Sequence, residues 1–242
     1  MAAIRIEGLT KRYRDVVAVD NLSLDVEWGE LFSLLGVNGA GKTTTIKMLC
    51  GLIQPTSGDA YLNGKSIRSE SSDVKSIIAL SPQETAVAPG LSVRENLGLI
   101  CGVCGFTREK QKEKIAQMTE LLGLDAVITK KAGKLSGGWQ RRLSIAMALI
   151  SEPEILFLDE PTLGLDVLAR RDLWDLIRSL KGKVTIILTT HYMEEAEQLS
   201  DRIGIMKDGR LLVCDTAQRL KEMAHTDSFE SAFVHIVKGV DK

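Results

Sequence analysis

Short hydrophobic runs alternate with segments of helical periodicity along this chain. Residues 31–35 (LFSLL) are nearly all apolar, and comparable runs lie at 76–81, 154–159 and 184–190. A continuous apolar run is typical of a parallel strand that is covered on both faces. Residues 202–209 (RIGIMKDG) predict a further strand that ends in the turn of a hairpin. Because helical patterns separate the runs, the sequence predicts an α/β core with a mainly parallel sheet.

The N-terminal strands follow a different pattern. Residues 3–9 (AIRIEGL) alternate apolar and polar positions, and residues 16–26 (VVAVDNLSLDV) continue in the same way. Such alternation is typical of antiparallel strands that have one solvated face. We therefore expect an N-terminal antiparallel β-subdomain.

Strand patterns stop between about residues 84 and 150. Ser92 and Glu95 have the spacing of a capping box, and helical periodicity continues through 108–124. A third helical pattern, 141–150, follows the stretch LSGG, so Ser136 is a candidate N-cap whose following glycines open the first turn. We expect a helical subdomain inserted into the α/β domain at this point. One more short helix is expected around residues 227–237.

Composition limits the possible functions. The chain has 242 residues, 44% hydrophobic and 26% charged, with a formal charge of −1. The chain has no overall positive charge, so its charge gives no indication of a nucleic-acid partner. No apolar run approaches the roughly 20 residues that a membrane-spanning helix needs. The first residues, MAAIRIEGL, lack the pattern of a secretion signal, so we expect a cytoplasmic protein.

Two cysteines form a C-x-x-C pair at Cys101 and Cys104. Such a pair can bind zinc or carry out redox chemistry, but His191, His225 and His235 lie far along the chain. Both cysteines fall within an apolar stretch, so we interpret them as packing residues. We assign no role to His225 or His235.

A phosphate-binding loop follows the apolar run at 31–35. Residues 36–44, GVNGAGKTT, match G-x-x-x-x-G-K-[ST] between a strand and a helix. Backbone N–H groups of such a loop surround phosphates, Lys42 reaches the β- and γ-phosphates, and Thr43 ligates Mg²⁺. A dinucleotide fold would require G-x-G-x-x-G instead. The sequence thus predicts a nucleoside triphosphate site formed by Gly36, Asn38, Gly39, Ala40, Gly41, Lys42, Thr43 and Thr44.

Two acids end another predicted strand, in ILFLDEP at 155–161. Ligands of α/β folds bind at the carboxyl edge of the sheet, where both side chains would emerge. Asp159 is therefore expected to hold Mg²⁺ through water, and Glu160 to polarise the water that attacks the γ-phosphorus. By itself the pair could be an ordinary solvated strand end, but the phosphate-binding loop makes that alternative less favourable.

The helix start at Ser136 predicts a second anion contact, since its first N–H groups have no partner within the helix. It lies far along the chain from the phosphate-binding loop, and one fold cannot easily bring both helix starts to one γ-phosphate. Two copies related by a twofold axis can do so. We expect each copy to lend this helix start to the other.

Together these motifs resemble the ATP-binding subunits of ABC transporters, over about residues 1–220. The resemblance implies a P-loop NTPase core and an ATP-sandwich dimer in which Ser136, Gly137 and Gly138 close on the partner's γ-phosphate. It also assigns four further positions. Tyr13 would stack on adenine, Gln83 would touch Mg²⁺, Asp166 would cross the dimer interface, and His191 would contact the γ-phosphate. Each of these four, taken alone, would be an ordinary surface, loop or strand-end residue.

One residue departs from the family pattern. The family usually has glutamine where this chain has Trp139, with Gln140 one position later. The expected phosphate contacts come from Ser136 and backbone N–H groups, so we expect hydrolysis to persist. Trp139 could pack at the dimer interface or stack on another apolar group.

The resemblance implies an ATPase that powers transport, with residues 1–222 as the ATPase domain and 223–242 as a short tail. A separate membrane permease would dock near residues 83–105 and hold the subunit at the cytoplasmic face. The C-terminal sequence looks most like the exporter branch. Two alternatives remain: a soluble ABC ATPase that acts as a scaffold or assembly factor, and a nucleotide sensor without turnover. Intact Glu160 argues against the sensor.

Overall fold

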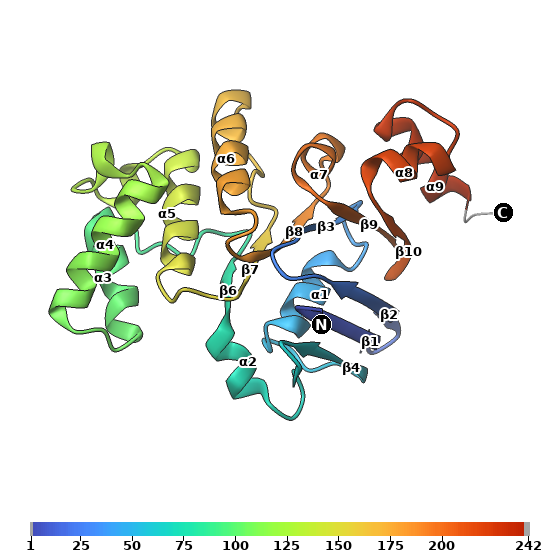
Figure 1. Cartoon of the computed structure of the whole chain (residues 1–242), viewed down its shortest axis with the longest axis horizontal. Helices are drawn as coiled ribbons and strands as arrows, with labels where there is room; N and C mark the ends of the chain where they lie inside the picture. Colours follow the sequence, from blue (N-terminus) through green and yellow to red (C-terminus); the bar gives the residue numbers. More distant parts are fainter. Residues whose placement is uncertain (1, 240–242) are drawn as a thin grey trace.

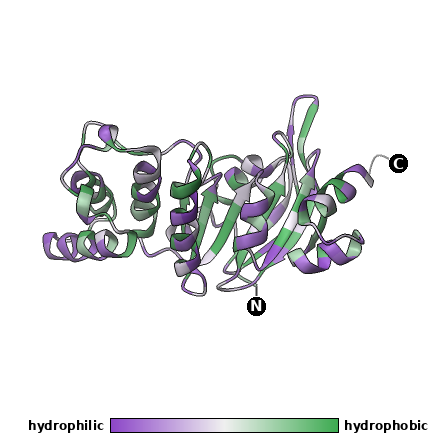
Figure 2. Ribbon diagram, turned by 90° about the horizontal axis from the view of Figure 1, so that it is seen from above, coloured by the Kyte–Doolittle hydropathy of each residue, from purple (hydrophilic) through white to green (hydrophobic). Residues whose placement is uncertain are grey.

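The structure, a computed structural model, describes residues 2–239. It contains a mainly parallel sheet flanked by helices, a small antiparallel sheet beside it, and a group of helices at one end (Figure 1). Hydrophobic residues concentrate on the central strands, and the outer faces of the helices are more hydrophilic (Figure 2). Within the described part of the chain, none of the helices has the length and hydrophobicity that crossing a bilayer requires.

The larger sheet has the strand order β10-β9-β3-β8-β7-β6. All neighbouring strands run parallel except the hairpin of β9 and β10. Their bounds are β3 Leu31–Gly36, β6 Ile78–Ser81, β7 Ile155–Asp159, β8 Thr185–Thr190, β9 Arg202–Lys207 and β10 Arg210–Asp215. The predicted parallel core and the predicted hairpin are confirmed.

One predicted strand begins too early. The apolar run at 76–81 is divided between the end of α2 (Ser71–Ile77) and the beginning of β6. Ile77 is buried as a helical residue and Ile78 starts the strand. A short apolar run does not distinguish a buried helix end from a buried strand, which explains the difference.

The smaller sheet has the order β2-β1-β4-β5 and is antiparallel throughout, as expected. Its strands are β1 Ile4–Tyr13, β2 Val16–Val26, β4 Ser57–Leu62 and β5 Lys65–Ser66. The second of these has the predicted bounds. The strands β4 and β5 were not expected from the sequence.

The expected helical subdomain lies at one end of the molecule (Figure 1). It consists mainly of α3 (Val93–Val103), α4 (Arg108–Leu122) and α5 (Gly137–Leu149). The capping box before α3 is confirmed, because Ser92 Oγ accepts from the backbone N–H of Glu95 at 3.2 Å and the Glu95 carboxylate accepts from the backbone N–H of Ser92 at 2.7 Å.

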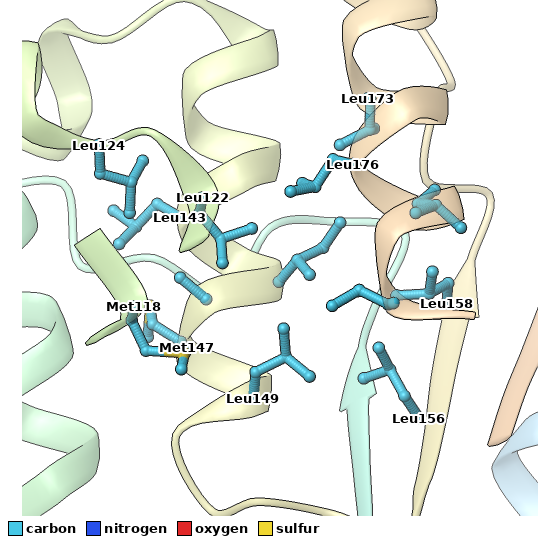
Figure 3. Close-up of a cluster of buried hydrophobic side chains, with 14 of the residues drawn as sticks. Met118, Leu122, Leu124, Leu143, Met147, Leu149, Leu156, Leu158, Leu173 and Leu176 are labelled. Carbon is cyan, nitrogen blue, oxygen red and sulfur yellow. The ribbon is translucent and has the colours of Figure 1, made fainter. Parts of the chain in front are cut away.

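A continuous hydrophobic cluster joins this subdomain to the larger sheet. Met118 and Leu122 of α4 meet Leu143 of α5, and Leu158 of β7 and Leu173 of α6 (Val167–Leu180) lie on the other side (Figure 3). All five side chains are buried. Helix α5 is therefore anchored both to the subdomain and to the sheet.

Three further helices border the sheet near its β9–β10 end, namely α7 (Met193–Leu199), α8 (Ala217–Met223) and α9 (Phe229–Gly239). Phe229 and Phe233 of α9 pack into a cluster with Leu35, Ala196 and Leu220. The helix expected at 227–237 is thus present as α9. Helix α8 was not expected.

Candidate functional site

The loop between β3 and α1 (Lys42–Leu49) can be formed only by glycine at several positions. Gly39 and Gly41 have φ angles of 84° and 103°, a region that favours glycine. A Cβ atom on Gly36 would lie 2.5 Å from Met206 O, and one on Gly41 would lie 2.5 Å from Ala18 O. The backbone therefore turns tightly before α1, whose first N–H groups begin at the loop.

A cavity of about 380 Å³ lies over this loop. It brings together residues from five separate parts of the chain, and four of these parts were grouped from the sequence. Its lining residues are Ala18, Asn38, Gly39, Ala40, Gly41, Lys42, Thr43, Thr44, Gln83, Glu160, Leu163 and His191. Gly36 lies behind the loop and contributes its carbonyl to the lysine contact described next.

Lys42 is buried and held by oxygen atoms. Its Nζ donates to Gly36 O at 2.8 Å and to Val37 O at 3.3 Å, and it lies 3.3 Å from Glu160 Oε1. A buried ammonium group is costly unless its charge is paired in this way. These three contacts place the ammonium group above the loop.

Asp159 forms an oxygen cluster with two threonines. Thr43 Oγ1 donates to Asp159 Oδ1 at 3.1 Å, and Thr189 Oγ1 donates to the same atom at 2.5 Å. Asp159 is buried and is not among the residues that line the cavity, whereas Thr43 and Gln83 do line it. Carboxylate, hydroxyl and amide oxygens are the ligand types that Mg²⁺ prefers, so these residues fit that ion.

Glu160 has an unusual backbone and a tightly held side chain. Its φ of 48° lies in the left-handed region, which is uncommon for a residue other than glycine. Its N–H donates to Thr189 O at 3.1 Å, and its Oε2 lies 2.7 Å from His191 Nδ1. Lys42 and His191 therefore hold the two carboxylate oxygens separately. Backbone strain of this kind often accompanies functional residues.

The start of α5 is open to solvent. Ser136 occupies the N-cap position as predicted, but its side chain makes no capping hydrogen bond. Ser136 and Gly137 are exposed, whereas Gly138 packs closely beside Ala169, where an added Cβ would lie 3.2 Å from the alanine Cβ. None of the predicted trans residues Ser136, Gly137, Gly138 and Asp166 lines the cavity of the same chain.

Asp166 and Tyr13 have other contacts in the single chain. Asp166 caps α6, where its Oδ1 accepts from the N–H groups of Leu168 at 3.0 Å and Ala169 at 2.9 Å. Tyr13 is 47% exposed, and Lys11 Nζ lies 5.0 Å from its ring centroid. Tyr13 does not line the cavity, so its stacking on adenine stays a prediction.

Trp139 packs within its own chain. Its ring is half-buried against the hydrophobic cluster of the helical subdomain, and the Arg142 guanidinium carbon lies 5.4 Å from the ring centroid. Trp139 therefore already packs on an apolar surface within the single chain, without a partner subunit.

Arg141 was not predicted as a site residue. It lies on α5 and is buried, and its guanidinium donates to Pro82 O and to Gln83 O, both at 2.6 Å. Burial lowers the pKa of Arg141, whereas the nearby carboxylates of Asp159 and Glu195 raise it. The adjacent arginines of WQRR look like solvated helix residues, so the sequence carries no signal for this contact.

Comparison with known proteins places these features in one family. The sequence profile described as ABC transporter matches residues 19–163, and a shorter profile described as an AAA domain matches residues 131–196. The chain is 40% identical over 245 residues to the Probable multidrug ABC transporter ATP-binding protein YbhF of Escherichia coli, covering 99% of this chain and 42% of YbhF. It therefore spans less than half the length of that relative.

Two other relatives are similarly close. The Nod factor export ATP-binding protein I of Burkholderia pseudomallei (strain 1710b) is 43% identical over 212 residues, which cover 87% of this chain and 69% of the relative. Human phospholipid-transporting ATPase ABCA3 is 42% identical over 226 residues, which cover 92% of this chain but only 13% of ABCA3.

Solved structures agree with the sequence matches. An ATP-binding subunit of an ABC transporter has a TM-score of 0.85 and 26% identity, over 97% of this chain and 99% of that chain. The ATP-binding cassette MJ0796, solved as a dimer in a post-hydrolysis state with ADP and Pi, has a TM-score of 0.78 and 25% identity, over 88% and 98%. The chain belongs to the ABC transporter family, as a nucleotide-binding ATPase of that family.

Proposed function

We propose that this chain hydrolyses ATP to power export through a separate membrane subunit. The observation that carries the proposal is the single cavity in which the glycine loop, Lys42, Gln83, Glu160 and His191 meet. The export assignment is supported by similarity to a protein named for Nod factor export and to one named as a probable multidrug transporter subunit. ATP + H₂O then gives ADP + phosphate inside the cavity, and closure and opening of a dimer transmit the work.

The loop and Lys42 are proposed to bind the phosphates. The N–H groups of the loop and of the α1 start point toward the site of the phosphates. Lys42 exchanges its present contacts with Gly36 O, Val37 O and Glu160 for oxygens of the β- and γ-phosphates. The proposed nucleotide contacts are Tyr13, Gly36, Asn38, Gly39, Ala40, Gly41, Lys42, Thr43 and Thr44.

Thr43, Asp159 and Gln83 would hold Mg²⁺. Thr43 and Asp159 are already joined by a 3.1 Å hydrogen bond, so their oxygens lie within reach of one ion. When bound, Mg²⁺ neutralises phosphate charge that develops during transfer. Thr189 helps to fix the Asp159 carboxylate, because its hydroxyl donates to the same carboxylate oxygen as Thr43.

Glu160 is the proposed general base. His191 Nδ1 holds Glu160 Oε2, and Lys42 holds Oε1. When Lys42 moves to the phosphates, Oε1 becomes free to accept a proton from water. The water oxygen then attacks the γ-phosphorus in line, and the bond to the ADP oxygen breaks. His191 and Gln83 complete the proposed catalytic group.

A second ATP-binding subunit, the same chain or a paralogue, would complete the site. The uncapped Ser136 hydroxyl and the open start of α5 are suited to a γ-phosphate held by the partner. Ser136, Gly137, Gly138 and Asp166 are the proposed residues in trans. The dimeric arrangement of the similar cassette MJ0796 supports this proposal.

The membrane subunit is proposed to dock near residues 83–105. Leu99 and Val103 of α3 lie in this range and are 50% and 79% exposed, which supports an apolar contact. The chain would then be cytoplasmic and peripheral on the membrane. The proposed ATPase domain is residues 1–222, and residues 223–242 form its tail. Helix α9 of the tail packs on α7 and β9 of the domain.

The test is co-purification from detergent-solubilised membranes with tagged E160Q and Mg-ATP. A stoichiometric multi-spanning protein identified by mass spectrometry is the expected result. The matched control is K42A/E160Q, which removes the phosphate-binding ammonium group and is expected to lose any partner that requires the ATP-bound dimer. Recovery of soluble proteins only would favour the scaffold or assembly function and contradict export.

A further inference from the structure

Glu195 is a fully buried acid without an ionic partner. It lies in the first turn of α7, four residues after His191, and its exposure is 0%. Trp174 Nε1 of α6 donates to Glu195 Oε1 at 3.0 Å. Within residues 2–239, no Lys, Arg or His nitrogen forms an ion pair with its carboxyl group. Glutamate is seldom fully buried unless its charge is paired.

Two buried threonines lie beside the same carboxyl group. Thr190 and Thr162 are both fully buried, and their hydroxyls face Glu195. Thr190 Oγ1 already accepts from the N–H of Tyr192 at 3.0 Å, so its own hydrogen is available for Glu195. Glu195 Oε2 and Thr162 Oγ1 both lack an aligned hydrogen-bond partner among the described residues.

These threonines lie next to the proposed catalytic pair, Thr162 in the loop after β7 and Thr190 at the end of β8. Thr162 follows Glu160 by two residues after β7, and Thr190 directly precedes His191 at the end of β8. The pair itself is joined by the 2.7 Å contact between Glu160 Oε2 and His191 Nδ1. Glu195 therefore touches both segments from the protein interior, while His191 and Glu160 meet on the cavity side.

A neutral carboxyl group suits this environment best. Burial raises the pKa of Glu195, and the charge of Glu160 raises it further. The hydroxyls of Thr190 and Thr162 and the indole N–H of Trp174 lower this pKa, but burial has the larger effect. Arg141 of α5 interacts electrostatically with Glu195, but its guanidinium hydrogen-bonds to Pro82 O and Gln83 O. The O–H of a neutral carboxyl group can donate to Thr162 Oγ1, which would give both unpartnered atoms a partner.

We propose that Glu195 is a positioning residue, a neutral carboxylic acid that joins the loop after β7 to the end of β8 and thereby sets His191 against Glu160. It acts through Thr162 and Thr190 and does not touch the nucleotide. The inference rests on the proposed hydrolysis at Glu160 and is independent of export.

The test measures steady-state ATP hydrolysis by the purified full chain over a range of ATP concentrations. In E195A the bridge is lost, and kcat is expected to fall roughly 10- to 100-fold, the scale of a ~1 Å misplacement of reacting groups. KM should change by less than about threefold, because the phosphate-binding loop is untouched. In E195Q the amide accepts from Trp174 and donates to a threonine, so kcat should stay within about threefold of wild type.

Two further variants separate positioning from a general loss of stability. L180A creates a cavity at the other end of α6, away from both segments, and should lower the melting temperature without lowering kcat well below that temperature. T162V preserves the shape of the threonine but removes its hydroxyl, so it provides the test if E195A does not fold. The double variant E195Q/T162V should be no slower than T162V, since both changes act through one contact.

Several results would overturn the proposal. One is a kcat for E195A equal to the kcat of L180A, when each variant is assayed at the same interval below its own melting temperature. Another is an E195Q as slow as E195A, which would mean that negative charge matters more than the hydrogen-bonded bridge. If E195A retains normal kcat, the bridge has no role. Absence of hydrolysis by the wild-type chain would instead refute the proposed ATPase mechanism itself, so the two failures are distinguishable.

Discussion

Lys42 and Glu160 form an ion pair inside the nucleotide cavity, with 3.3 Å between Nζ and Oε1 and both side chains almost fully buried. The residue proposed to bind phosphate thus neutralises the residue proposed to activate water. When ATP binds, its phosphates must replace the Glu160 carboxylate as the partner of Lys42. Only then does the carboxylate oxygen become free. The pair therefore links nucleotide binding to the appearance of the base.

Replacing Glu160 with glutamine should slow ATP hydrolysis by ~10²–10⁴-fold, the usual contribution of a general base. Bound ATP then persists, and we expect E160Q to form a dimer with Mg-ATP, measured by light scattering. H191A serves as a comparison, because it leaves the base in place and should retain more activity. A chain that stays monomeric in E160Q with saturating Mg-ATP would contradict the proposed sandwich.

The same pair makes a prediction for the nucleotide-free protein. In K42M the carboxylate of Glu160 keeps only its histidine contact inside the cavity, and an uncompensated buried charge typically costs about 3–5 kcal/mol. K42M/E160Q removes both charges and should recover much of that loss. Urea unfolding of the two variants and of wild type measures the difference. Equal destabilisation of K42M and K42M/E160Q would show that the cavity tolerates the unpaired carboxylate.

The sequence predicts elements well where one local rule decides the structure. The strands β3, β7 and β8 follow from continuous apolar runs, and the loop before Lys42 follows from its glycines and its position between strand and helix. Local rules fail where an apolar run serves two elements, as at the junction of α2 and β6. The short strands β4 and β5 contain few apolar residues; β4 depends on pairing with β1, and β5 on pairing with β4.

Contacts between distant segments that no motif marks were not predictable. Glu195 lies in MEEAEQL, which looks like an exposed acidic helix, and only packing against α6 reveals that it is buried beside Thr162 and Thr190. Arg141 likewise reaches the backbone of Gln83 across 58 positions of the chain. A single sequence does not show which polar residues the fold turns inward.

Gly36 offers a steric test of the loop. In G36A the new methyl carbon would lie 2.5 Å from Met206 O, so the turn must shift and disturb the carbonyl that Lys42 contacts. We expect weaker nucleotide binding, measured by calorimetry, together with a lower melting temperature. G90A is the matched control, because a Cβ there meets nothing within 4 Å. Unchanged nucleotide affinity in G36A would mean that the loop adapts without moving its phosphate-binding groups.

The buried Glu195 also predicts how stability depends on pH. Its pKa in the folded protein is raised, chiefly by burial, above the ordinary value of 4.5 that it recovers on unfolding. As pH rises above about 4.5, the unfolded chain releases this proton first, so the acid favours unfolding until the folded form also ionises. Glutamine cannot ionise, so the melting temperature of E195Q should exceed that of wild type at neutral pH, and the difference should shrink as the pH falls toward 4.5. E194Q, at the exposed neighbouring position, is the control and should show no such trend. If E195Q is instead less stable than wild type at neutral pH, Glu195 is ionised in the folded protein and its carboxylate is stabilised there.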